Sequence, residues 1–250
     1  MAKKYGPIYQ LSFPGGQKII YVCNFELVDQ VCDQKRFRKG IKGTLSEVRT
    51  LVGDGLFTAH HGEQAWGVAH RILMPAFSPA KIRVMFDSMT DIANQLIGKF
   101  GPDYVIDANE DFTRLTFDTI TLCAMSYRLN SFYSVCPCGN RSLRPAFVKN
   151  NLSRSANAQF EADKKTMFDL TTDIIKKRKE NLTTAPNDLL QLMLTERDPV
   201  TGLGMSDENI ANNLMTFWIA GHETTSGLLS FTVSFLSSSR YFLDIIDADS

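Results

Sequence analysis

Apolar residues recur along this chain with two different spacings. Near the start, Ile8–Phe13 and Gln17–Val22 are rich in β-branched and aromatic residues, and they flank the turn-forming Pro14-Gly15-Gly16. This combination predicts a β-hairpin. From Phe25 onward the apolar residues lie three or four positions apart, which is the spacing of one face of an amphipathic helix. The pattern therefore predicts a fold that is mostly α-helical, with one small β-hairpin.

Helical spacing continues in four stretches before residue 130. A glycine-punctuated loop, Gly53–Glu63, separates the first from the second. Pro75 is expected to end or kink the second stretch, because proline has no N–H to donate within a helix. The fourth stretch has a broad apolar face. The stretches are Leu45–Val52, Gln64–Phe77, Pro79–Phe100 and Phe112–Leu129.

A long helix is expected towards the end of the chain. Ser134–Asn140 interrupts the helical pattern, and Ala156–Asn181 resumes it. Ser206 can then cap a helix whose first two residues are acidic and so favour its positive end. From there to about Leu236 the sequence has no Lys or Arg. A helix over this segment would be about 45 Å long. No segment has the composition of a linker, so one domain is expected rather than two.

Charge and composition narrow the class of protein. The 27 basic residues balance the 27 acidic ones, so no overall charge draws the chain to nucleic acid, and no nucleic-acid partner is expected. Hydrophobic residues make up 44% of the chain, which is typical of a soluble globular protein. The opening residues MAKKYGPIYQ contain no apolar core. Neither a signal peptide nor a transmembrane anchor is therefore expected, and a cytoplasmic location is predicted.

The cysteines give no sign of a disulfide framework. Their number is odd and their spacing irregular, which favours reduced thiols. The pair in Cys136-Pro-Cys138 has neither a second cysteine pair nor a nearby histidine, so no zinc site is expected there. The five are Cys23, Cys32, Cys123, Cys136 and Cys138.

A polar island, Gly221–Ser226, interrupts the apolar run FWIAGHETTSGLLSF. A membrane span would place Glu223 at great cost in lipid, and the zinc motif H-E-x-x-H fails because position 226 is serine. Two interpretations remain open. In one, the helix crosses a buried cavity, where Gly221 lets something flat approach and Thr224 and Glu223 supply a hydroxyl and a carboxylate. In the other, the hydroxyls bond to carbonyls one turn earlier and merely bend the helix.

The sequence of this island, AGHETT, resembles the A-G-x-E-T-T motif in the central helix of the cytochrome P-450 haem-thiolate monooxygenases. The longer string IAGHETTSGLLSF is most similar to their soluble fatty-acid hydroxylases, which are fused to a flavin reductase. Three further strings resemble the family in the same order: KYGPIYQLSFPGG, GDGLFTAHHGEQAWGVAHRILMPAFSP and LTFDTITLCAMSYRLNSFY. The resemblance implies the distal, amino-terminal half of a cytochrome P-450 domain over residues 1–236, and 237–250 reads as an unrelated tail.

The resemblance also implies a reaction and its participants. The cofactor would be haem (heme b), and the substrate a fatty-acid-like or other apolar molecule that is hydroxylated with O2. Electrons would come from NADPH through an FAD/FMN flavoprotein reductase, fused or separate. By motif, Thr224 and Glu223 are the expected catalytic pair, an alcohol and an acid that deliver protons.

Several residues are expected at the haem and the substrate by the same resemblance. Ala220 and Gly221 would lie over the haem face. Trp66 and His70, four residues apart and so on one side of a helix, would donate to the haem propionates, with Lys39 nearby. The expected substrate residues are equally compatible with ordinary core or surface positions. They are Tyr21 at the channel mouth, Leu45, Val48 and Val52 along an apolar channel, and Phe57 as an aromatic gate.

The chain departs from the family pattern at the iron ligand. The family's cysteine lies in F-x-x-G-x-R-x-C-x-G, and none of the five cysteines has that context. A thiolate ligand favours O–O cleavage by pushing electron density onto the iron. This chain by itself is therefore expected to bind haem weakly or not at all. The alternative hypothesis is a catalytically inactive fragment that at most binds an apolar ligand or partner.

Overall fold

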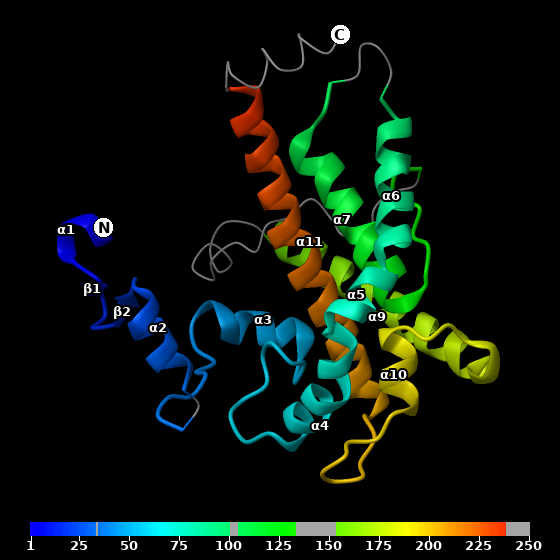
Figure 1. Ribbon diagram of the computed structural model, residues 1–250, viewed down its shortest axis with the longest axis horizontal. Coiled ribbons are helices and arrows are strands. Elements are labelled where there is room, and N and C mark those ends of the chain that lie inside the picture. Colours follow the sequence, from blue (N-terminus) through cyan, green and yellow to red (C-terminus); the bar gives the residue numbers. More distant parts are fainter. Residues whose placement is uncertain (34, 101–104, 134–153, 239–250) are drawn as a thin grey trace. The chain divides into compact units, whose positions relative to one another are not determined.

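The computed structural model describes residues 1–33, 35–100, 105–133 and 154–238 (Figure 1). The chain forms two compact units, Met1–Gly40 and Ile41–Ser250, and each is considered by itself. The predicted segment 134–140 lies outside the described residues, as does nearly all of the predicted tail.

The first unit contains the predicted hairpin. Strands β1 (Ile8–Ser12) and β2 (Lys18–Val22) pair antiparallel, with Ile8 opposite Val22. A short helix, α1 (Ala2–Tyr5), precedes them, and α2 (Phe25–Cys32) follows. Asn24 caps α2 by accepting a hydrogen bond from the backbone N–H of Leu27, which satisfies one of the free donors of a helix start.

The second unit consists of helices in its described part. The prediction of a mostly α-helical fold with one small hairpin is confirmed. The elements are α3 (Thr44–Val52), α4 (Gln64–Leu73), the 3-10 turn η1 (Met74–Phe77), α5 (Pro79–Val84), α6 (Phe86–Gly98), α7 (Ala108–Met125), α9 (Arg154–Glu180), the 3-10 turn η2 (Leu182–Thr184), α10 (Leu189–Thr195) and α11 (Asp207–Ser237).

Several helix ends differ from the predicted ranges. The helix predicted over Pro79–Phe100 is two helices, which meet at Met85. α7 begins four residues earlier than predicted, because the Asp107 side chain accepts hydrogen bonds from the first turn. It ends at Met125, because Ser126 adopts a left-handed conformation with φ 48°. α4 gives way to a 3-10 turn at Met74, one residue before the proline.

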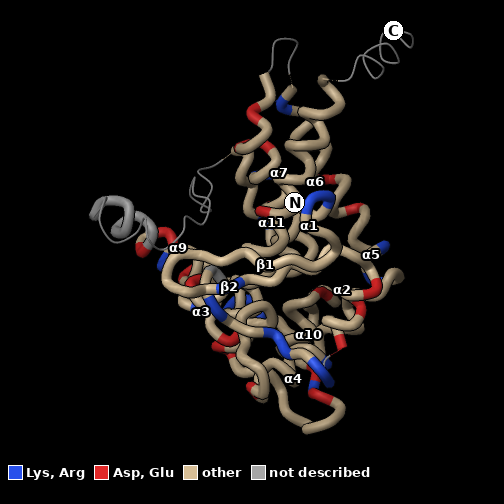
Figure 2. Tube along the Cα trace, turned by 90° about the vertical axis from the view of Figure 1, so that its left-hand side faces the viewer, with Lys and Arg blue, Asp and Glu red and all other residues tan. Residues whose placement is uncertain are grey.

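The amino-terminal half of helix α11 lies in the core of the second unit. It packs along α7 and also contacts α9, α10 and α3; Figures 1 and 2, in two perpendicular views, both show α7 beside α11. Leu214, Met215 and Trp218 of α11 are fully buried. The indole N–H of Trp218 donates to the hydroxyl of Thr121 on α7 at 2.8 Å. Among the described helices, none has the length and apolarity that crossing a membrane would require.

Candidate functional site

Helix α11 has one face against α7 and an opposite face that is open. Because successive residues of an α-helix are about 100° apart, Trp218, His222 and Ser226 share one side. That side is packed: Thr116 of α7 donates to the backbone carbonyl of His222 at 3.1 Å, and Ser226 is buried. Ala220 and Thr224 are on the opposite side and are exposed. We call this opposite side, from Ala220 to Phe235, the outward face.

The outward face is mainly apolar. Beyond Thr224 it presents Leu228, Phe231 and Phe235, whose exposed fractions are 66%, 80% and 75%. A contiguous exposed apolar surface of this kind usually marks a site of contact with a ligand or another protein surface. The outward face therefore combines an apolar contact surface with a hydroxyl at its beginning.

The hydroxyl of Thr224 is held within the helix. Its Oγ1 donates a 2.8 Å hydrogen bond to the carbonyl of Ala220. Ser226 Oγ bonds in the same way to the carbonyl of Glu223 at 3.2 Å. The back-bonding predicted by the second interpretation of the polar island is therefore present, although α11 continues without a break. It leaves the lone pairs of Thr224 Oγ1 available as acceptors beside the exposed carboxylate of Glu223.

Gly221 does not open the outward face. A Cβ atom at this position would lie 2.9 Å from Cγ1 of Ile120 on α7 and 3.2 Å from its Cβ. The expectation that Gly221 makes room for a flat ligand is thus corrected: the missing side chain makes room for α7. Ala220, on the other side of the helix, is the small residue that the outward face presents.

Trp66 and His70 form a pair on one side of α4, as their spacing predicts. Their rings stack with centroids 4.6 Å apart and an interplanar angle of 23°. Both side chains are partly exposed, and within the described part of the chain nothing bonds to their ring nitrogens. The pair therefore has N–H groups that can donate to a carboxylate. Lys39 and Tyr21 belong to the first unit, so the place of Lys39 near this pair and that of Tyr21 at the channel mouth stay predictions.

Two of the predicted channel residues lie in the core instead. Val48 is 4% exposed and Val52 0%, and both belong to the main hydrophobic cluster with Leu73 and Leu214. The expectation that they line a channel is corrected, because α3 turns them inward against the core. Leu45 is partly buried, and Phe57 is 49% exposed. Phe57 is thus the most accessible of the predicted substrate residues in the second unit.

Sequence reasoning missed a polar contact between the glycine-rich loop and the start of α11. Asp54 Oδ1 accepts hydrogen bonds from the side chains of Asn209 and Asn212 at 2.9 and 2.8 Å. The backbone N–H of Leu56 donates to Asn213 Oδ1 at 3.0 Å. The sequence did contain a signal for this contact. Three asparagines occur within five positions of a predicted helix, and asparagine is unfavourable in helix interiors.

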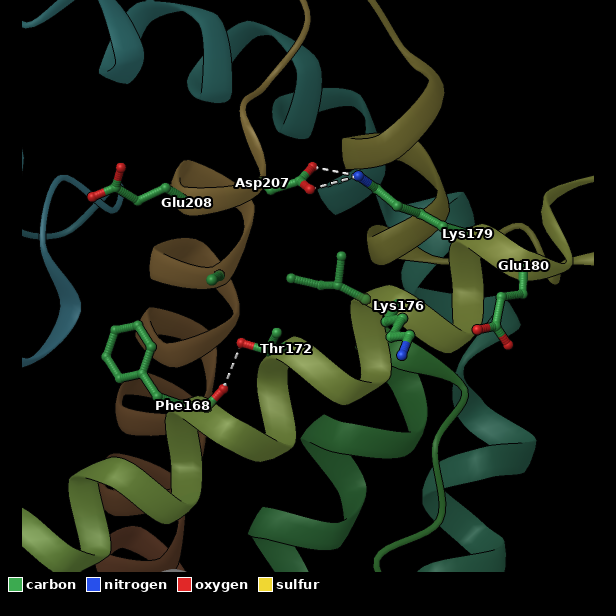
Figure 3. A pocket seen from close by; sticks show the side chains of 9 residues that line it. Phe168, Thr172, Lys176, Lys179, Glu180, Asp207 and Glu208 are labelled. Atoms are coloured by element: carbon green, nitrogen blue, oxygen red, sulfur yellow. Dashed lines mark hydrogen bonds and ion pairs between the residues drawn. The ribbon is translucent and has the colours of Figure 1, made fainter.

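A separate hollow of about 700 Å³ lies between α9 and the first turn of α11 (Figure 3). At its edge Lys179 Nζ contacts both carboxylate oxygens of Asp207 at 2.6 Å. Phe168 and Ile175 of α9 are among its lining residues. None of the predicted site residues lines it.

The described cysteines differ in exposure and in the unit to which they belong. Cys123 is on α7, where burial raises the pKa of its thiol to about 11, so it is protonated at neutral pH. Cys23 and Cys32 belong to the first unit and are exposed. Cys136 and Cys138 lie outside the described residues.

Comparison with known proteins gives a consistent result. The family model described as Cytochrome P450 matches residues 1–240. A self-sufficient cytochrome P450 monooxygenase of Phanerodontia chrysosporium is 48% identical over 94% of this chain and 24% of its own length. A bifunctional cytochrome P450/NADPH–P450 reductase of Acremonium egyptiacum is 46% identical over the same shares. The chain thus spans about a quarter of the length of these relatives.

A solved structure shares the fold. The crystal structure of the cytochrome P450DA heme domain superposes with a TM-score of 0.80 at 35% sequence identity. The match covers 95% of this chain and 54% of that domain.

Proposed function

The chain belongs to the cytochrome P450 family, and from that premise we propose that it supplies the distal wall of a haem site at which an apolar substrate is hydroxylated. The observation that carries the proposal is the outward face of α11. This face presents the small side chain of Ala220 beside the exposed Thr224 and Glu223. Beyond them it continues as an apolar surface.

The described residues fit one side of a haem. Ala220 leaves the backbone of α11 accessible to a flat macrocycle, and Trp66 and His70 can donate to its two carboxylates, the propionates. The residues present do not supply the iron ligand: no cysteine of this sequence stands in the family's ligand motif. This chain therefore fits the distal face, and weak haem binding is proposed for it.

The residues of α11 have defined parts in the proposed reaction. Haem, when bound, supplies the centre at which O2 is activated, with electrons from an NADPH-dependent flavoprotein reductase like the one named in the relatives. Thr224 Oγ1 donates its hydroxyl hydrogen bond to the Ala220 carbonyl, so its lone pairs can accept a hydrogen bond from a proton donor on the outward face. The exposed Glu223 exchanges protons with solvent. As Thr224 Oγ1 accepts a proton, its own hydroxyl proton leaves the Ala220 carbonyl for an acceptor on the outward face, so the pair relays protons from solvent and Thr224 keeps no extra one.

A fatty-acid-like substrate is proposed on the apolar character of this region. Phe57 and the apolar part of the outward face favour a hydrocarbon chain, which gains about 0.8 kcal/mol for each buried CH2 group. Tyr21, in the first unit, is proposed to hold the carboxylate of such a substrate. The alternative is that the outward face binds an apolar partner without haem; the exposure of Leu228, Phe231 and Phe235 favours it.

The two proposals differ in haem binding. We would express residues 1–250 with haem supplied, measure the absorption of bound haem, and then reduce the sample and add carbon monoxide. The proposed function predicts weakly bound haem whose carbon monoxide complex lacks the thiolate-type Soret shift. A complete absence of bound haem would favour the apolar-partner alternative. A thiolate-type shift would show that a cysteine of this chain ligates the iron and would overturn our assignment.

A further inference from the structure

The loop that carries Phe57 lies so close to α11 that two of its positions have no room for a side chain. A Cβ atom at Gly53 would lie 2.4 Å from Nδ2 of Asn212, and one at Gly55 would lie 2.3 Å from Oγ1 of Thr216. Gly53 also has a φ of 54°, which favours glycine. The two glycines therefore let the loop backbone lie directly on α11.

Hydrogen bonds fix the loop on the amino-terminal side of Phe57. The N–H of Leu56 donates to Asn213 Oδ1 at 3.0 Å across 157 positions of sequence. Asn213 Nδ2 in turn donates to the carbonyl of Asn209 at 2.8 Å, which orients the amide. Asn213 is fully buried, so replacing it with an apolar residue would leave the Leu56 N–H without its acceptor.

A second set of bonds fixes the other side of Phe57. Arg49 Nη1 donates to the carbonyl of Thr58 at 2.6 Å, while Nη2 contacts Glu63 Oε1 at 2.7 Å. The hydroxyl of Thr58 donates to the carbonyl of Gly53 at 2.7 Å. The residues before and after Phe57 are thus anchored to α11 and α3, while the phenyl ring itself is 49% exposed.

The anchored loop ends where the outward face begins. Asn209, Asn213, Thr216 and Ala220 follow each other at intervals of four, three and four positions, so they are on one side of α11. The first three are buried and Ala220 is exposed. Asn213 and Ala220 are about 10 Å apart along the helix axis. The loop therefore covers this side of α11 as far as Thr216. Phe57 comes directly after Leu56, whose N–H bonds to Asn213.

We infer that Asn213 and Arg49 are positioning residues that hold Phe57 in one orientation at the amino-terminal edge of the outward face. They act through the backbone on its two sides, and neither needs to touch a substrate. This inference rests on the proposed function for the role of Phe57 at the substrate. A fixed ring at this edge determines the direction from which an apolar chain can reach Ala220 and Thr224.

The test places 4-trifluoromethylphenylalanine at position 57 of the 250-residue chain and records its ¹⁹F NMR spectrum without ligand. The unchanged background is expected to give one line. Asn213→Leu, which removes the acceptor, is expected to add a second line or shift the resonance towards that of the free amino acid. Arg49→Met tests the other anchor at a more exposed position and is also expected to split the line.

Thr121→Val is the matched control, because it removes a buried hydrogen bond from the opposite side of α11. It is expected to lower the melting temperature and leave the ¹⁹F line single. The inference is overturned if Asn213→Leu and Arg49→Met leave one unshifted line, or if Thr121→Val splits it as they do. Several lines in the unchanged background would overturn it as well. None of these outcomes depends on haem, so failure of the proposed function appears separately, in the haem-binding measurement.

Discussion

Ile120 of α7 occupies the space that a side chain at position 221 of α11 would need, with its Cγ1 2.9 Å from the place of the absent Cβ atom. This contact sets how closely the two helices approach. Because Gly221 faces α7, the residue before it, Ala220, and the residue three after it, Thr224, are left on the outward face. The glycine of the polar island thus serves the site through the packing of two helices.

Gly221→Ala is predicted to destabilise the fold. The change gains up to about 1 kcal/mol of helix propensity, but overpacking against Ile120 costs about 1–3 kcal/mol. Gly227→Ala, on the same helix with open space around it, is the control and should stabilise by about 0.5–1 kcal/mol. Urea unfolding measures both. Ile120→Ala should relieve the clash, so that the double variant is more stable than the sum of the single changes predicts.

The pH dependence of stability should reveal the ion pair between Arg71 and Asp198. Arg71 donates to both Asp198 oxygens at 2.5 and 2.7 Å, and this bonding, with that of Thr201, holds the pKa of the Asp198 carboxyl far below its ordinary value. A lowered folded-state pKa gives stability that is complete above the unfolded pKa of about 3.9 and is lost as the pH falls below it. Asp198→Asn should therefore flatten the stability profile below about pH 4.

The exposed pair formed by Lys165 and Asp169 is the comparison for this prediction. Asp169→Asn should change the low-pH profile much less, because exposed ion pairs contribute little. Thermal melts from pH 2 to pH 7 measure the three proteins. An unchanged slope in Asp198→Asn would contradict the role assigned to the pair.

Local sequence patterns predicted most of the helices and the hairpin, whereas they could not predict which helices pack against one another. The hairpin follows from β-rich runs around Pro14-Gly15-Gly16, and Ser206 caps α11 as predicted, by accepting from the N–H of Asn209. Trp66 and His70 share a face because their spacing is that of one helical turn. By contrast, the burial of Val52 depends on what α3 packs against, which no spacing within α3 reveals.

Two other features show the same limit of sequence patterns. The bond from Leu56 to Asn213 joins residues 157 positions apart, and no local motif announces its partner. α10 has only seven residues, too few for a helical period to stand out from a short apolar run. Its burial of Leu189 and Met193 comes from its place against α4 and α7.

The apolar part of the outward face is predicted to contribute little to the stability of this chain. Phe231→Gln combined with Phe235→Gln should change the free energy of unfolding by no more than about 0.5 kcal/mol, because both rings are exposed. The double variant should also bind less of an apolar fluorescent dye. Phe117→Ala, at a fully buried position, should cost about 3–5 kcal/mol. A comparable loss in the double variant would show that the outward face is covered within the chain.

Cys123 is predicted to react slowly with alkylating reagents. Burial raises the pKa of its thiol to about 11, so little thiolate is present at pH 8. Iodoacetamide labelling followed by peptide mass spectrometry should give a rate at least about tenfold lower for Cys123 than for the exposed Cys23. Unfolding in urea should remove the difference. Equal rates in the folded protein would contradict the placement of Cys123 within the α7 packing.

The central claim, that the outward face of α11 contacts haem, can be tested at Ala220. Ala162 of α9 is a close control: it is also exposed, and its carbonyl also accepts from a threonine one turn later, Thr166 at 2.9 Å. We would titrate the unchanged chain, Ala220→Phe and Ala162→Phe with haemin and follow the quenching of tryptophan fluorescence. Our account predicts saturable quenching that Ala220→Phe weakens at least about tenfold, or 1.4 kcal/mol, and Ala162→Phe leaves unchanged. Equal affinities in all three proteins, or no saturable quenching in any, would contradict it.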